Sequence, residues 1–141
     1  MIGDGPERPR ALERAQALGV EDRVVFLGKH ASVEELLPCA DLFLLTSGLE
    51  SFGLAALEAM ASGVPVVVAN EAGLAEVVDD AGLMVNPSDT GAIADALLRI
   101  TEDETLRADM IARGLERARK FTWKAAAGNV WAAIEQACAS F

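Results

Sequence analysis

The stretch that decides the fold reads Glu50-Ser-Phe-Gly-Leu-Ala-Ala-Leu-Glu58-Ala-Met-Ala-Ser-Gly-Val-Pro65. Before it, residues 41–47 form an apolar run closed by hydroxyl side chains, which is typical of a buried parallel strand. After it, residues 63–69 are rich in valine and predict the next strand. Strand, turn, helix and strand form a βαβ unit, and sheets built from such units bind ligands beside the turns that follow their strands. The turn at residues 50–53 is therefore the candidate site.

This turn has the features of an anion site. Gly53 lacks a Cβ, so its backbone can approach a ligand closely. The helix that follows leaves its first N–H groups unpaired, near Ser51 to Leu54. These groups carry a partial positive charge that suits phosphate.

Glu58 lies about two turns into the same predicted helix. It shares a face with Leu54, Leu57 and Ala61, so we expect its carboxylate on or beside the apolar side. A buried carboxylate needs hydrogen-bond donors, since an unpaired buried charge is costly. Ribose hydroxyls would supply them. Alternatively, Glu58 is a rim residue bonded to a neighbouring backbone group or arginine.

At these residues the sequence resembles the retaining glycosyltransferases of the GT-B fold, the "glycosyl transferases group 1" family that includes glycogen synthases and mannosyltransferases. The C-terminal, donor-binding domain of that family carries a Glu-x7-Glu motif, which Glu50 and Glu58 match. The resemblance covers essentially the whole chain. It continues, in the family's order, at residues 3–6, 24–28, 73–78, 80–87 and 117–123. Residues 50–65 are also similar to the enzymes that join N-acetylglucosamine to malate.

The resemblance implies an α/β fold, with a Rossmann-like parallel sheet and flanking helices that form a truncated C-terminal half of a GT-B fold. It also implies a hexosyltransferase, whose parent enzyme moves a hexose from a nucleotide diphosphate sugar to an acceptor with retention of configuration.

The same resemblance implies a role for each site residue. Glu50 would contact hydroxyls of the donor sugar and act as the catalytic residue, and Glu58 would hold the ribose. The other implied donor-binding residues are Ser51, Phe52, Gly53 and Leu54 around the distal phosphate, Gly3 in a ligand-facing turn, and Lys29 and His30 near the base. We expect no cofactor and no metal, because oriented amides can stabilise a departing diphosphate and the sequence has no Asp-x-Asp motif or His/Cys cluster.

The chain also departs from the family pattern. It has no N-terminal acceptor domain, and residue 1 corresponds to the end of the donor domain's second strand. We therefore treat residues 1–141 as a single, N-terminally incomplete donor-binding domain, and as a fragment of a longer protein. The missing loop is where the family places an Arg and a Lys on the diphosphate, so we expect weak donor binding and no turnover from this chain alone. We also expect the strand at residues 24–27 to shift alongside residues 42–46, unless another chain fills the gap.

Composition limits the possible partners. The chain has 12 basic and 22 acidic residues and a formal net charge of −10, which disfavours nucleic acid and anionic lipid as partners. No apolar run is long enough to predict a membrane span. Cys39 and Cys138 are expected to be unpaired, core-type thiols, which fits a cytoplasmic protein.

The remaining pattern predicts further elements. Helices are expected at residues 9–18, 32–38, 90–100, 104–120 and 123–139, and a last short strand at 83–85. The favoured interpretation of Trp123 and Trp131 is that both fill the local core. The alternative is an exposed apolar surface on the last helix, which would favour self-association.

Two other functions compete with the enzyme. The chain could be a non-catalytic module of the same fold, kept for assembly with a partner or for weak ligand binding. A sugar-nucleotide epimerase is less favoured, because the pattern of Glu50 and Glu58 fits the transferases better.

Overall fold

The computed structural model describes residues 1–48 and 50–139. The chain forms two compact units, Met1–Val33 and Glu34–Phe141, which we call the first and the second unit. Together they make an α/β protein with a three-stranded parallel sheet and flanking helices, as expected. In chain order the elements are α1 (Arg8–Ala17), η1 (Glu21–Arg23), α2 (Val33–Leu36), η2 (Leu37–Cys39), β1 (Phe43–Leu45), α3 (Leu54–Ala61), β2 (Val66–Ala69), α4 (Ala72–Val78), η3 (Asp79–Ala81), β3 (Leu83–Val85), α5 (Thr90–Glu102), α6 (Glu104–Ala118) and α7 (Trp123–Ala139).

The first unit is a helix followed by extended chain. A proline lies in the first turn of α1, and Gly19 follows the helix with φ +65°, a conformation that glycine adopts without strain. Extended residues then return to the start of the chain. Two isolated bridges join them to it, from Gly28 to Ile2 and to Gly3. The N–H of Leu27 also donates to the carbonyl oxygen of Met1 at 2.8 Å, and the amino group of Met1 donates to the carbonyl oxygen of Val25 at 2.6 Å.

The prediction of a strand at residues 24–27 is wrong. The structure assigns no strand there, and the sheet of the second unit consists of β1, β2 and β3. The predicted shift of this segment alongside residues 42–46 is therefore wrong as well. The pairing with residues 1–3 is too short for a ladder to form, and Val25 stays mostly exposed.

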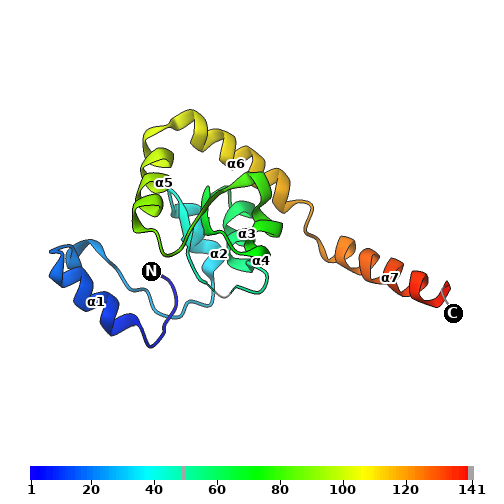
Figure 1. The fold of residues 1–141 in the computed structure, drawn as a ribbon, viewed down its shortest axis with the longest axis horizontal. Helices are drawn as coiled ribbons and strands as arrows, with labels where there is room; N and C mark the ends of the chain where they lie inside the picture. The colour runs from blue at the N-terminus through cyan, green and yellow to red at the C-terminus, as the bar shows by residue number, and fades with distance from the viewer. Residues whose placement is uncertain (49, 140–141) are drawn as a thin grey trace. The chain divides into compact units, whose positions relative to one another are not determined.

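The sheet of the second unit has the order β1-β2-β3, with both pairs parallel. β2 is its central strand, and all four of its residues are fully buried. A strand covered on both faces needs a continuous apolar run rather than an alternating one, which explains the sequence Val-Val-Val-Ala. α3 and α5 contact the strands, and α6 packs on both of these helices (Figure 1).

One part of the core of the second unit lies between the sheet and the helices α5 and α6, and α3 and α4 contribute further fully buried residues. Ile100 of α5 and Met110 of α6 are fully buried there against Val67 of the central strand. Both helices begin at an aspartate whose carboxylate accepts a backbone N–H at 2.9 Å, Asp89 for α5 and Asp103 for α6. These caps satisfy donors that the first helical turn leaves unpaired.

Two arginines of α6 hold the C-terminal end of α4 and the 3₁₀ turn η3 that follows it. Arg117 donates from Nε to the carbonyl oxygen of Val77 at 3.0 Å, and Arg113 donates to the carbonyl oxygen of Asp80. The last carbonyls of a helix have no partner within it and carry partial negative charge, so guanidinium groups suit this position.

The residue that follows α4 has a strained backbone. Asp79 has φ +52° and ψ −128°, a backbone conformation that residues other than glycine rarely adopt. We expect Asp79→Gly to raise the free energy of unfolding by about 1 kcal/mol, because relief of this strain exceeds the entropy cost of glycine. The Asp79 carboxylate, 3.6 Å from Arg117, is itself largely exposed, so its loss costs little. Urea unfolding of Asp79→Gly and of the parent chain measures the expected rise in the free energy of unfolding.

Asp80→Gly is the matched control, since it removes the same charge from the next residue, which has no positive φ. It should lower stability by about 0.5–1 kcal/mol. Equal losses in both variants would contradict the strain at Asp79.

The prediction that Trp123 and Trp131 fill a local core is wrong. α7 has the predicted bounds, but Trp123 is 93% exposed and Trp131 is 63% exposed, so neither fills a local core. Val130 and Ile134 are exposed as well, which agrees with the alternative of an uncovered apolar surface. Cys39 and Cys138 are unpaired as expected, yet both are exposed rather than part of the core. In the described part of the chain, no helix combines the length and the apolar character needed to cross a bilayer.

Candidate functional site

The candidate site is built around the turn between β1 and α3. Glu50 is half-buried, and its carboxylate oxygen Oε1 accepts the N–H of Gly53 at 3.2 Å. Gly53 immediately precedes α3 with φ +83°. The positive φ favours glycine at this position. Lack of space favours it as well, because an added Cβ would lie 2.6 Å from Cδ2 of Leu74. Glu50 and Gly53 therefore fix the entry of the chain into α3.

A second glycine fixes the turn from the side of α4. A Cβ added to Gly73 would lie 2.8 Å from the carbonyl oxygen of Ser51 and 3.0 Å from that of Glu50. The start of α4 thus rests directly on the backbone of the turn. The sequence placed Gly73 only in the family pattern at residues 73–78 and did not indicate this contact, because its partners lie more than twenty residues away in the chain.

The start of α3 offers free hydrogen-bond donors. The N–H groups of Ala56 and Leu57 both donate to the carbonyl oxygen of Gly53. Among the residues that the structure describes, none accepts from the N–H of Leu54 or Ala55. These two donors stand at the positive end of the helix dipole, so the turn can bind an anion as the sequence indicated.

The expectation for Glu58 needs a correction. The buried side of α3 is formed by Ala56, Ala59 and Met60, whereas Glu58 is exposed. Leu54, at 57% exposed, and Ala55 lie on the same exposed side as Glu58. The apolar residues were assigned to the wrong face because α3 is apolar on nearly every side. Glu58 therefore needs no internal donor, and its carboxylate is accessible to a ligand.

Phe52 completes the turn and packs on a residue from far along the chain. Its ring meets that of Phe121 edge-on, with centroids 6.0 Å apart and an angle of 79° between the planes. Phe121 follows α6 and was not among the predicted site residues. Its apolar character and its place between two helices were the only signals in the sequence.

Three predicted site residues lie in the first unit. Gly3 has φ +107° and donates its N–H to the carbonyl oxygen of Gly28 at 2.7 Å, which places it beside the loop that carries Lys29 and His30. Both of those side chains are exposed. Glu50, Ser51, Phe52, Gly53, Leu54 and Glu58 belong to the second unit.

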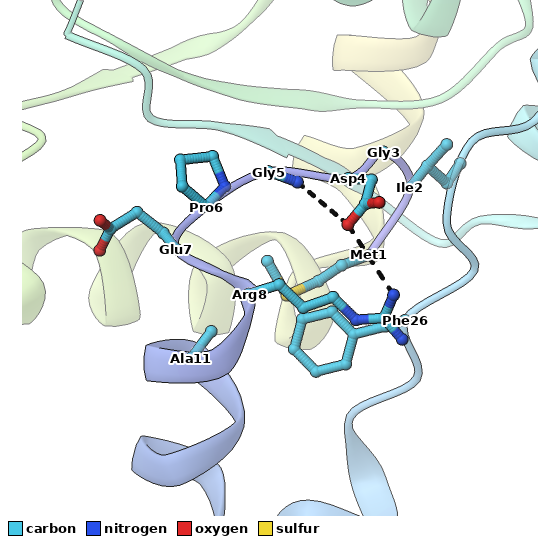
Figure 2. A pocket seen from close by; sticks show the side chains of 10 residues that line it. All are labelled: Met1, Ile2, Gly3, Asp4, Gly5, Pro6, Glu7, Arg8, Ala11 and Phe26. Atoms are coloured by element: carbon cyan, nitrogen blue, oxygen red, sulfur yellow. Dashed lines mark hydrogen bonds and ion pairs between the residues drawn. The ribbon is translucent and has the colours of Figure 1, made fainter.

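Gly3 also lines a surface pocket of about 400 Å³ in the first unit. Figure 2 shows Arg8 lying across the ring of Phe26, 5.4 Å from its centroid, with its guanidinium toward Asp4 at 3.8 Å. The lining includes none of the residues around α3. Within residues 1–48 and 50–139, the structure brings together no three His, Cys, Asp or Glu side chains that could hold a metal ion.

Comparison with known proteins identifies the family. The model of the family described as glycosyl transferases group 1 matches residues 1–117. The chain belongs to this family. Because that match includes the turn and α3, the candidate site lies within the matched region.

The relatives of this chain include enzymes. The chain is 44% identical over 118 residues to N-acetyl-alpha-D-glucosaminyl L-malate synthase of Bacillus anthracis, covering 82% of this chain and 31% of that protein. It is 46% identical over 127 residues to D-inositol 3-phosphate glycosyltransferase of Salinispora tropica, covering 86% of this chain and 26% of that protein. The chain thus spans about a quarter to a third of these relatives. The non-catalytic alternative is not favoured.

Solved structures agree with the fold class. Sucrose-phosphate synthase of Thermosynechococcus elongatus superposes with a TM-score of 0.81 at 30% identity, covering 99% of this chain and 38% of that one. Anabaena Alr3699/HepE in complex with UDP superposes with a TM-score of 0.79 at 26% identity, covering 99% of this chain and 40% of that one. The expected GT-B-type α/β architecture is therefore confirmed.

Proposed function

We propose that this chain is the donor-binding part of a glycosyltransferase that moves a hexose from a nucleotide diphosphate sugar to an acceptor, with retention of configuration. One observation carries the proposal. The exposed side of α3 begins at the two unpaired N–H groups of Leu54 and Ala55, has Glu50 at its N-terminal edge and carries Glu58 one turn further on.

The spacing along α3 suits the order of groups in such a donor. Leu54 and Glu58 are four residues apart, which is about 6 Å along the helix axis. This is comparable to the separation between the distal phosphate and the ribose of a nucleoside diphosphate. With the distal phosphate at the helix start, the ribose would reach Glu58, and the sugar would lie on the side of Glu50.

The geometry also suits the chemistry of transfer. The bond between the sugar's anomeric carbon and the distal phosphate oxygen breaks, and negative charge builds on the departing diphosphate. The N–H groups of Leu54 and Ala55 would stabilise that charge without reorganising. Glu50, whose orientation is held by Gly53, would bind sugar hydroxyls and fix the anomeric carbon beside the acceptor. For retention, the acceptor hydroxyl would form the new bond on the face that the diphosphate leaves and pass its proton to the departing phosphate oxygen.

Two of the solved neighbours support the choice of ligand. Anabaena Alr3699/HepE is described in complex with UDP and, in another crystal structure, with UDP-glucose. The acceptor would be bound by a further domain, and no metal or other cofactor is part of the proposal.

A titration followed by NMR tests the proposed function. UDP-, GDP- and ADP-sugars are added to the chain at millimolar concentrations, and the amide resonances of Ser51, Gly53 and Leu54 are followed. We expect saturating shifts at these residues with one class of nucleotide, and weak affinity, since the net charge of −10 opposes an anionic ligand. Absence of shifts at these amides with all three classes would refute donor binding at α3.

Glu58→Ala should weaken donor binding by about 10- to 100-fold, because hydrogen bonds to a charged group are worth about 1.5–3 kcal/mol. The fold should be unaffected, since the residue is exposed and alanine favours helices. The dissociation constant from the same titration measures the effect.

Glu102→Ala, at the exposed end of α5, is the matched control and should bind the donor like the parent chain. A nucleotide that lacks both ribose hydroxyls should bind the parent chain and Glu58→Ala with equal affinity. If Glu58→Ala weakened this analogue as strongly as the natural nucleotide, the carboxylate would not be acting on the ribose.

A further inference from the structure

The turn at residues 50–53, which we call the donor loop, is held on three sides. Gly53 packs on Leu74, and the backbone of Ser51 packs on Gly73, so two supports come from α4. The third support is the contact of Phe52 with Phe121. Only this third contact comes from outside the segment that runs from β1 to α4.

Phe121 is itself held in place by Arg117. The guanidinium carbon of Arg117 lies 5.1 Å from the centroid of the Phe121 ring, a cation–π contact. The same guanidinium is fixed on its other side, because Nε donates to the carbonyl oxygen of Val77 at 3.0 Å and Nη1 lies 3.6 Å from the Asp79 carboxylate. The end of α4, Arg117, Phe121 and Phe52 therefore form one continuous set of contacts that ends at the donor loop.

The Phe52 ring depends on this set for its position. It is 46% exposed, so the core of the second unit does not enclose it. The next residue, Gly53, donates the hydrogen bond that orients Glu50 and supplies the carbonyl at the start of α3. A Phe52 ring free to move would let the peptide between Phe52 and Gly53 rotate, and both functions of that peptide would be weakened.

We propose that Phe121, held by Arg117, is a positioning residue for the donor loop. Through Phe52 it keeps the carboxylate of Glu50 and the N–H groups at the start of α3 in the arrangement that binds the donor. This inference rests on the proposed function for its effect on the ligand, whereas its effect on the loop stands on the contacts alone.

The test compares Phe121→Leu, which keeps an apolar side chain but removes the ring, with Phe121→Tyr, which restores it. Two quantities are measured by NMR on the whole chain: the amide exchange rate of Gly53 and the dissociation constant of the nucleotide sugar that gives the strongest shifts. An edge-on aromatic pair is worth an equilibrium change of about two- to tenfold. We therefore expect Phe121→Leu to raise both quantities by about that factor, and Phe121→Tyr to stay within about twofold of the parent chain.

Two controls separate positioning from stability. Phe26→Leu removes a ring that pairs with Arg8 in the first unit, so it should leave Gly53 exchange and donor affinity unchanged. The amide of Val67, in the buried central strand, reports global unfolding. The double variant Phe52→Leu with Phe121→Leu should bind the donor no more weakly than Phe52→Leu alone, because the second ring would have nothing left to hold.

The outcomes are distinct. An unchanged Gly53 exchange rate in Phe121→Leu would overturn the inference, as would an equal rise at Val67, which would make Phe121 a residue of general stability. If Gly53 responds while the parent chain binds none of the three nucleotide-sugar classes, the proposed function fails and the positioning of the loop stands.

Discussion

Ile100→Ala is expected to lower the free energy of unfolding by about 3–5 kcal/mol. Ile100 is fully buried between α5, α6 and the central strand, with Met110 and Val67 as neighbours. Truncation removes the transfer free energy of three carbon atoms and leaves a cavity that a sheet and two packed helices cannot close. Urea unfolding followed by circular dichroism measures the loss.

Leu98→Ala, two residues earlier in the same helix, is the matched control. Leu98 is 52% exposed, and alanine favours the helix, so its stability should change by less than about 0.5 kcal/mol. Losses of similar size in the two variants would contradict the assignment of the core to the Ile100 side of α5.

Gly53→Ala is the second large effect, and we expect the free energy of unfolding to fall by about 2–5 kcal/mol, together with loss of donor binding. The positive φ of Gly53 costs an alanine about 1–2 kcal/mol. The new Cβ would also lie 2.6 Å from Cδ2 of the fully buried Leu74, so the packed Leu74 side chain, the turn or the start of α4 must shift, which adds about 1–3 kcal/mol. The backbone strain at residue 53 and a shift of the turn would both displace the N–H groups of Leu54 and Ala55. Urea unfolding and the nucleotide titration measure the two losses.

Gly128→Ala serves as the control for Gly53→Ala. It lies within α7, where an added Cβ meets no atom within 4 Å, so stability should stay the same or rise slightly. A second comparison separates the two terms: in a Leu74→Ala background, Gly53→Ala should cost only the backbone strain of about 1–2 kcal/mol. A cost in that background as large as in the parent chain would show that the clash with Leu74 does not exist.

Much of the second unit could be predicted from local pattern. The valine-rich run at β2 has to be buried on both faces, and Pro, Gly and Asp at helix ends limit where the helices begin. The predicted helices at residues 90–100, 104–120 and 123–139 therefore correspond to α5, α6 and α7, within one turn at each end. The turn before α3 was also predictable from local pattern, because a glycine between a predicted strand and a predicted helix is typical of a turn.

The same reasoning gave wrong predictions for two features of this chain. Residues 24–27 have the composition of a strand, but a strand exists only where a neighbour pairs along its length. Here the pairing is limited to isolated bridges at Gly28 and a few hydrogen bonds with Met1. Trp123 and Trp131 have the composition of core residues, but no other element of the described chain covers α7. Composition reports what a side chain favours, and the outcome depends on what packs against it.

The sequence by itself determined the βαβ order, the place of the turn and the presence of two carboxylates around it, because these depend on residues near one another in the chain. Only the tertiary structure decided which side of α3 is buried, and hence that Glu58 faces solvent, since an almost wholly apolar helix has no intrinsic inner face. The supports of the turn from Leu74, Gly73 and Phe121 were also decided by tertiary packing. Each of these contacts joins segments that are far apart in the sequence. Such contacts depend on how the helices and strands pack, which no local sequence pattern specifies.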